Sequence, residues 1–215
     1  GVALDTVGID LAALLAAGAI FAIGLGFAMQ NIAQNFVSGV ILLTGRAIKP
    51  GDVIDVNNVI CRVSRLGIRA TIVQTRDGED IIVPNSLLAG SAVKNYTLET
   101  SAFRLRTTVG VTYESDMRRV RQVLESTVAA LDWQLREHPA HVIMLEFAAN
   151  SVVWEVAVWI GDPWRARKML STLNEAIWFA FADSGIVIAF PQLDVHFDGA
   201  LTEGLTRFTG SKVAG

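Results

Sequence analysis

The sequence contains one long uncharged apolar run, the 19 residues from Leu11 to Met29. As an α-helix this run would measure about 28 Å, close to the roughly 30 Å of a bilayer's hydrocarbon core. A signal peptide is not expected, because the residues before the run include Asp5 and Asp10 instead of a basic segment. A buried helix of a water-soluble protein is disfavoured by three internal glycines, each of which would cost about 0.5–1 kcal/mol there. The run therefore predicts a transmembrane helix.

Charged residues are distributed unevenly around this helix. Residues 1–45 contain no lysine or arginine, whereas residues 46–76 contain six basic and only two acidic residues. The six are Arg46, Lys49, Arg62, Arg65, Arg69 and Arg76. By the positive-inside rule, the chain after the helix is expected in the cytoplasm and the N-terminus on the opposite side of the membrane.

The apolar run has two distinct faces. One is a ridge of small residues at three- or four-residue steps: Ala12, Ala16, Ala19, Ala22 and Gly26. Beside it lies a stripe of large apolar residues that continues into three amides: Ile20, Ile23, Phe27, Gln30, Asn31 and Gln34. If identical helices packed in a ring through the ridge, the stripe would face the axis and expel water from a narrow pore. A stripe that faces lipid or another helix fits the periodicity equally well.

The next segment, NFVSGVILLTG at residues 35–45, is apolar but too short to span a bilayer. It is predicted to form a second helical piece along the membrane–water interface. A bend near Gln30–Gln34 is expected to separate it from the first helix.

Residues 50–97 have the pattern of a small β-domain. Short runs rich in valine and isoleucine alternate with the turn signals Pro50-Gly51, Asn57-Asn58 and Asp77-Gly78. The runs are DVIDV, VICRV, RATIVQT and EDIIVP. Four or five strands within fewer than fifty residues predict a strongly bent barrel.

Residues 103–197 alternate between strand and helix patterns. The predicted order is a strand in FRLRTTVGVTY, a helix over 115–131, strands in HVIMLEFAA and SVVWEVAVWI, a second helix and a final strand within 186–197. Ser115 or Asp116 is the expected N-cap of the first helix, and the second is expected to begin at Pro163 and to stop at Gly185. This β-α-β-β-α-β order is ferredoxin-like. The predicted divisions are therefore 1–45, 46–97, 98–197 and a tail at 198–215.

No residue cluster predicts catalysis, a metal site or a cofactor site. His138 and His141 flank Pro139 in HPAH, which is typical of a surface loop, and His196 on the last predicted strand is expected to be structural. The single Cys61 excludes a disulfide framework and is expected to be a small buried hydrophobe. A net charge of −3 disfavours nucleic acid as a partner. The chain is predicted not to be an enzyme.

Four stretches resemble one known family. The run GLGFAMQNIAQNFVSGVILLTGRAIKPGDVIDV resembles the third transmembrane helix and the following β-domain of the small-conductance mechanosensitive channel (MscS) family. IIVPNSLLAG, VGVTYESD and GIVIAFPQLDVHF resemble its β-domain, the entry to its α/β domain and its closing strand. The similarity covers about residues 10–197 in the family's order.

The resemblance implies an α+β membrane protein with a pore-lining helix, an Sm-like β-barrel domain and a ferredoxin-like α/β domain. It also implies a homoheptamer in the inner (plasma) membrane, with the last two domains forming a cytoplasmic cage. Such a channel would contact membrane lipids, open under membrane tension and release ions and small osmolytes on hypo-osmotic shock.

The resemblance also implies roles for single positions of this chain. The hydrophobic seal corresponds to Ile23 and Phe27, and the close-packing small positions to Ala19, Ala22 and Gly26. The glutamine that ends the family's pore segment corresponds to Gln30. The family's first bend corresponds to Asn31, and its second bend corresponds to Gly39. Some family members have glycine at the first bend, so the asparagine leaves the position of the bend open.

Family members place at least two further membrane helices before the pore helix, and these sense tension. The ten residues before Leu11 leave no room for them, so either this sequence omits them or the protein is a reduced form. Two alternatives stay open at this point. One is a channel of the same architecture gated by a cytoplasmic ligand, and the other is a non-conducting, membrane-anchored oligomeric module.

Overall fold

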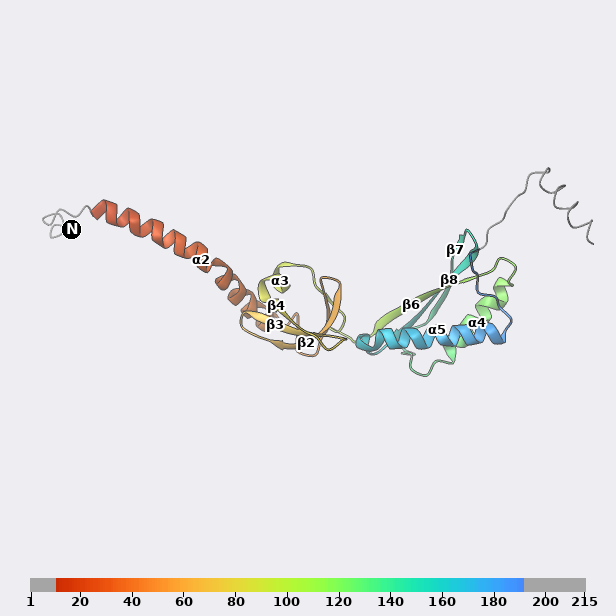
Figure 1. The fold of residues 1–215 in the computed structure, drawn as a ribbon. Helices are drawn as coiled ribbons and strands as arrows, with labels where there is room; N and C mark the ends of the chain where they lie inside the picture. Colours follow the sequence, from red (N-terminus) through yellow and green to blue (C-terminus); the bar gives the residue numbers. More distant parts are fainter. Residues whose placement is uncertain (1–10, 192–215) are drawn as a thin grey trace, which may run out of the picture. The chain divides into compact units, whose positions relative to one another are not determined.

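The structure, a computed structural model, describes residues 11–191 (Figure 1). Its contacts divide these residues into two compact units. The first unit holds the described residues up to Leu105 together with Asp132–Pro139 and Val158–Thr172. The second holds Arg106–Leu131, Ala140–Ala157 and the described residues from Leu173 onward. The predicted boundaries at residues 45, 97 and 197 stay predictions.

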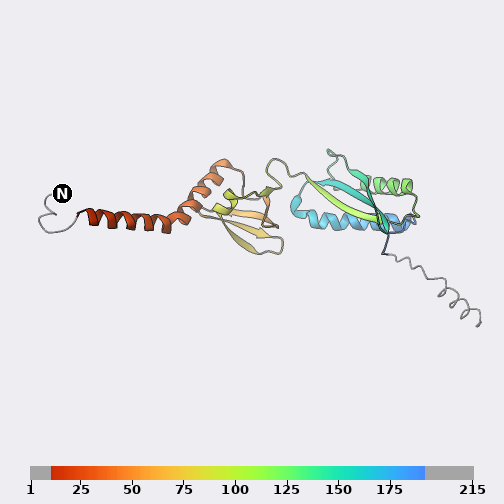
Figure 2. The same cartoon turned by 90° about the horizontal axis from the view of Figure 1, so that it is seen from above.

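The N-terminal helix, α2 (Leu11–Gly45), runs without interruption for 35 residues. The predicted second helical piece at residues 35–45 is therefore continuous with the first, and the predicted bend near Gln30–Gln34 does not interrupt the helix. The segment contains no proline, so the backbone hydrogen bonds of the helix continue through Gln30, Asn31 and Gln34. The helix axis turns part-way along, as Figure 2 shows. From Ala12 to Gly45 the helix is long and apolar enough to cross a membrane, in agreement with the sequence prediction. Arg46 ends it in the left-handed conformation, with φ of 51°.

The β-domain is a five-stranded antiparallel sheet in the order β4-β3-β2-β1-β5. Its strands are β1 (Val53–Val56), β2 (Val59–Leu66), β3 (Ala70–Thr75), β4 (Asp80–Pro84) and β5 (Lys94–Asn95). The first four confirm the predicted runs, whereas β5 and the short helix α3 (Asn85–Gly90) lack a predicted counterpart. A register shift between Val63 and Arg65 marks a bulge, which adds to the bend of β2.

One hydrophobic core joins the end of α2 to the sheet. Its buried residues come from the helix, the following turn, four strands and α3: Leu42, Ile48, Ile54, Cys61, Val63, Val73, Val83 and Leu88. The last turns of α2 therefore fold as part of the β-domain, because the apolar surface of Leu42 is removed from water there.

The remaining elements confirm the predicted α/β order. They are β6 (Phe103–Val111), α4 (Met117–Ala129), β7 (His141–Ala148), β8 (Ser151–Ile160), the 3₁₀ turn η1 (Pro163–Arg165) and α5 (Ala166–Asp183). The sheet order is β6-β8-β7, and an antiparallel bridge pairs Ile188 with Val111 of β6. The final segment thus lies beside the first strand, as the ferredoxin-like arrangement requires.

Two of the predicted helix boundaries follow local chemistry. Asp116, not Ser115, caps α4, because its carboxylate accepts hydrogen bonds from the N–H groups of Arg118 and Arg119. Gly185 follows α5 with φ of 68°, a conformation that glycine adopts without strain. Residues 192–197 of the predicted last strand, His196 among them, and the tail at 198–215 lie outside the described residues.

The state of Cys61 gives a first prediction, since the thiol is buried in the β-domain core. Burial, with a smaller contribution from Asp55, raises the pKa of Cys61 to about 11. Because only the thiolate reacts, alkylation by iodoacetamide at pH 8 should be roughly a hundredfold slower in the folded protein than in urea, and should accelerate as pH approaches 11. Cys61 is the only cysteine in the sequence, so mass spectrometry of the alkylated chain reports on it alone. Equal rates in folded and unfolded protein would contradict its burial.

Candidate functional site

The predicted seal residues lie exposed along α2. Ile20, Ile23 and Phe27 are 72%, 60% and 72% exposed within one copy of the chain. The amides that continue the stripe, Gln30, Asn31 and Gln34, are exposed as well. Because α2 is one continuous helix, these residues keep the common face that their spacing predicts. Such an apolar surface requires lipid or other copies of the helix to cover it.

The small-residue face is also open. Ala19 and Ala22 are exposed, and no atom outside the helix backbone lies within 4 Å of a Cβ built on Gly26. The structure therefore leaves room for another helix along this ridge.

The second part of α2 is fixed to the β-domain. Ser38 and Leu42 are buried, and the side-chain oxygen of Asn35 accepts a hydrogen bond of 3.0 Å from the N–H of Ser86 in α3. Gly39 lies so close that an added Cβ would clash with the carbonyl oxygen of Ile68 and lie 2.6 Å from Asn85 Nδ2. The predicted second-bend position thus lies in close contact with the β2–β3 turn and the start of α3.

Asn85 organises the surface on which α2 rests. It is 1% exposed, and its Nδ2 donates hydrogen bonds of 3.0 Å to the carbonyl oxygens of both Gly67 and Ile68. Its Oδ1 accepts a hydrogen bond of 2.9 Å from Thr71 Oγ1. The buried amide is therefore satisfied at both ends, and it locks the β2–β3 turn against the start of α3.

A second polar group fixes the turn that follows α2. The buried Asp52 carboxylate accepts hydrogen bonds from the N–H of Lys49 at 3.0 Å and from Asn95 Nδ2 at 2.8 Å. Asn95 Nδ2 also donates to the carbonyl oxygen of Ala47 at 3.0 Å. The segment from residue 46 to 52 is therefore held against β5.

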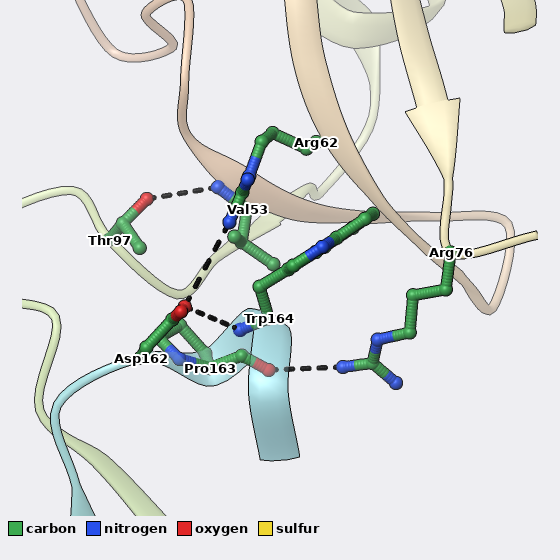
Figure 3. A network of polar contacts seen from close by, with 7 residues as sticks. All are labelled: Val53, Arg62, Arg76, Thr97, Asp162, Pro163 and Trp164. Carbon is green, nitrogen blue, oxygen red and sulfur yellow. Dashed lines mark hydrogen bonds and ion pairs between the residues drawn. The ribbon is translucent and has the colours of Figure 1, made fainter. Parts of the chain in front are cut away.

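The β-domain also holds the segment that begins α5, as Figure 3 shows. The guanidinium carbons of Arg62 and Arg76 lie 4.7 and 5.7 Å from the ring centroid of Trp164. Arg76 Nη2 donates a hydrogen bond of 3.0 Å to the carbonyl oxygen of Pro163, and Arg62 Nη2 lies 3.9 Å from Asp162 Oδ1. The same Asp162 oxygen caps η1 by accepting from the N–H of Trp164. We name these five residues the tryptophan clamp.

The strength of the tryptophan clamp comes mainly from the aromatic ring. The Arg62–Asp162 pair is 43% and 45% exposed, and ion pairs in such surroundings contribute little. A guanidinium over a tryptophan face contributes about 0.5–2 kcal/mol, and here one ring receives two of them.

Two family descriptions match most of the chain. "Mechanosensitive ion channel, beta-domain" matches residues 31–98, and "Mechanosensitive ion channel MscS, C-terminal" matches residues 105–188. An uncharacterized MscS family protein of Archaeoglobus fulgidus is 31% identical over 202 residues, which are 92% of this chain and 69% of that protein. This chain belongs to the MscS family. The resemblance predicted from the sequence is confirmed, and the family is one of ion channels rather than enzymes.

Other relatives and solved structures agree with this assignment. An uncharacterized MscS family protein of Haemophilus influenzae is 37% identical over 193 residues, and the mechanosensitive channel MscK of Escherichia coli is 30% identical over 189. The chain spans only 17% of the length of each of these two proteins. The structure of Helicobacter pylori MscS in its closed state matches with a TM-score of 0.84 at 23% identity, over 92% of this chain and 78% of that one. This likeness confirms the MscS fold.

Several contacts in this MscS-family chain have no counterpart in the sequence prediction. Asn35 contacts a residue 51 positions away, and Asn85 contacts residues 14 to 18 positions away. Trp164 contacts residues 88 or more positions away, so no local periodicity marks any of the three. A partial signal exists for Asn85, because Pro84 ends β4 and a proline is common near the start of a helix.

The close contact at Gly39 gives a second prediction. Gly39→Ala should weaken the attachment of α2 to the β-domain, because overpacking of about 1–3 kcal/mol outweighs the gain in helix propensity. Hydrogen exchange of the Ser86 amide, which donates to Asn35, should accelerate about tenfold. Gly45→Ala is the matched control, since nothing lies within 4 Å of a Cβ there. Equal exchange rates in the two variants would contradict the proposed contact.

The tryptophan clamp gives a third prediction. Trp164→Ala should lower the free energy of unfolding of the detergent-solubilised protein by about 2 kcal/mol, because both guanidinium–ring contacts are lost. Trp178→Ala is the control, since Trp178 lies on α5 and is 59% exposed. Its effect should stay within about 0.5 kcal/mol. If the two substitutions destabilise the protein equally, the clamp is not a stabilising contact.

Proposed function

We propose that copies of this chain form a mechanosensitive ion channel whose pore is closed by a ring of Ile23 and Phe27 side chains. The observation that carries the proposal is the exposed stripe of Ile20, Ile23 and Phe27 on a helix that could span the membrane. The names of relatives, such as the mechanosensitive channel MscK, support the same function. The oligomer is a homoheptamer in this proposal, as the family resemblance implies.

The proposed closed state rests on the exclusion of water. Rings of bulky apolar side chains around a narrow axis leave water molecules without hydrogen-bond partners, so the lumen dries and stops conducting. Neighbouring helices approach through Ala19, Ala22 and Gly26, whose small size permits close packing. Ile20, Gln30, Asn31 and Gln34 line the pore next to the seal.

Opening is driven by membrane tension multiplied by the in-plane area that the channel gains. The two parts of α2 have different freedom in this proposal. From Asn35 onward the helix is attached to the β-domain, whereas the residues from Ala12 to Gln34 are exposed on every side in one copy. The N-terminal part is therefore the one that moves, with the exposed amides between Gln30 and Gln34 at the boundary.

The proposed setting is the inner membrane, with the residues after α2 in the cytoplasm. The basic residues that follow the helix support this orientation. Residues 1–45 then supply the pore, 46–97 the barrel and 98–197 the α/β part of a cytoplasmic cage. The permeating species are ions and small osmolytes released on hypo-osmotic shock. Electron microscopy of the purified protein tests the assembly, because a monomer or dimer would favour a membrane anchor over a channel.

The seal gives a fourth prediction. Phe27→Ser should produce a channel that leaks and opens at lower tension, because each copy loses about 2 kcal/mol of apolar burial in the closed ring. The measurement is patch recording from reconstituted full-length protein under suction.

Phe21→Ser is the matched control for this recording. Phe21 is 73% exposed like Phe27, but it lies six residues earlier and about 120° around the helix. Its substitution should leave the threshold unchanged. A normal threshold in Phe27→Ser, or an equal shift in both variants, would contradict the seal assignment.

A further inference from the structure

A cavity of about 230 Å³ lies where α2 ends and the β-domain begins. It is lined by Leu43, Arg46, Ile48, Lys49, Pro50 and Leu66. Four of these six residues are apolar and two are cations, so the cavity combines a hydrophobic wall with positive charge. This combination suits an amphiphilic anion.

The two cations are available to a ligand. The Arg46 and Lys49 side chains are exposed, and none of the ion pairs within residues 11–191 involves either of them. The carboxylate nearest in sequence, Asp52, is buried and accepts from the backbone of Lys49 and from Asn95. Neither charge is therefore neutralised by a neighbouring carboxylate of the same turn.

The cavity is preformed by the backbone that carries it. Arg46 adopts the left-handed conformation with φ of 51°, and its N–H donates to the carbonyl oxygen of Leu42 at 3.2 Å. Asp52 and Asn95 hold the following turn in place. A site built on fixed backbone orders few groups when a ligand binds, which favours affinity.

We propose that this cavity binds the headgroup region of an anionic phospholipid. The lipid phosphate contacts Arg46 and Lys49, while its glycerol or the start of an acyl chain packs on Leu43, Ile48 and Leu66. The place in the chain supports a lipid over a soluble anion, because the cavity opens directly at the end of the helix that could span the membrane. Basic residues beside a membrane helix attract anionic lipids in this way.

A lipid at this position would tie the end of α2 and the first turn of the β-domain to the bilayer surface. Leu42, next to the cavity-lining Leu43, belongs to the β-domain core, so the bound lipid and the core would hold neighbouring residues of one helix. The proposal rests on α2 lying in a membrane, as the proposed function does, but it does not require that the protein conducts ions.

The test measures lipid retention by the full chain. Protein is reconstituted with equal amounts of phosphatidylglycerol and phosphatidylcholine, extracted into mild detergent and analysed by native mass spectrometry. The double variant Arg46→Gln/Lys49→Gln should retain about tenfold less phosphatidylglycerol. The matched control Arg167→Gln/Lys168→Gln removes one exposed arginine and one exposed lysine from α5 and should retain the normal amount. Unchanged retention in the first variant, or equal loss in both, would overturn the proposal.

Two further arms identify the ligand and the cavity. Leu43→Gln keeps both charges and should lower phosphatidylglycerol retention severalfold; no change would overturn the role of the apolar wall. Excess inorganic phosphate should leave the retained lipid in place, whereas its displacement by phosphate would show a soluble-anion site and overturn the lipid assignment. If the double variant does not fold, Lys49→Gln alone supplies the charge arm, because its side chain is exposed. Lipid retention does not depend on conduction, so a protein that binds lipid without conducting would refute only the proposed function.

Discussion

The contact on which the rest of the structure depends is the close approach of α2 to the β-domain at Gly39. A side chain there would meet the carbonyl oxygen of Ile68, so only glycine lets the helix lie against the β2–β3 turn. Asn85 holds that turn with both polar ends of its amide, and Leu42 extends the contact into the core. These contacts fix the direction of α2 relative to the β-domain.

Two segments, the end of α2 and the start of α5, are attached to the β-domain. At one, α2 is fixed by packing and by the Asn35–Ser86 hydrogen bond; at the other, the tryptophan clamp holds the start of α5. The two differ in kind, because the first is largely buried whereas the second includes half-exposed charges. In a channel whose moving part is the N-terminal portion of α2, the β-domain would serve as the fixed support for that movement. A lipid bound beside Arg46 and Lys49 would act on this same support.

Much of the secondary structure could be predicted from the sequence, since the signals are local. Strand runs between turn residues, the cap at Asp116, Pro163 at the first turn and Gly185 after α5 all act within a few residues. The same local reasoning missed β5 and α3, and it did not establish that α2 continues as one helix from Leu11 to Gly45. The exposed amides at 30–34 differ in polarity from the rest of the helix, but they do not remove a backbone donor, so the helix continues through them.

What the sequence by itself determined is most of the helices and strands, the spacing of residues along α2 and the family. Helix length, periodicity and turn chemistry are properties of neighbouring residues. The stretches that resemble the MscS family contain these features in the family's order. Only the tertiary structure decided that Gly39 is a contact point, that Asn85 supports it, that Trp164 lies between two arginines and that a cavity opens beside Arg46. Each of these brings together groups that are distant along the chain, and the free energy of such contacts depends on distance in space, which no local pattern records.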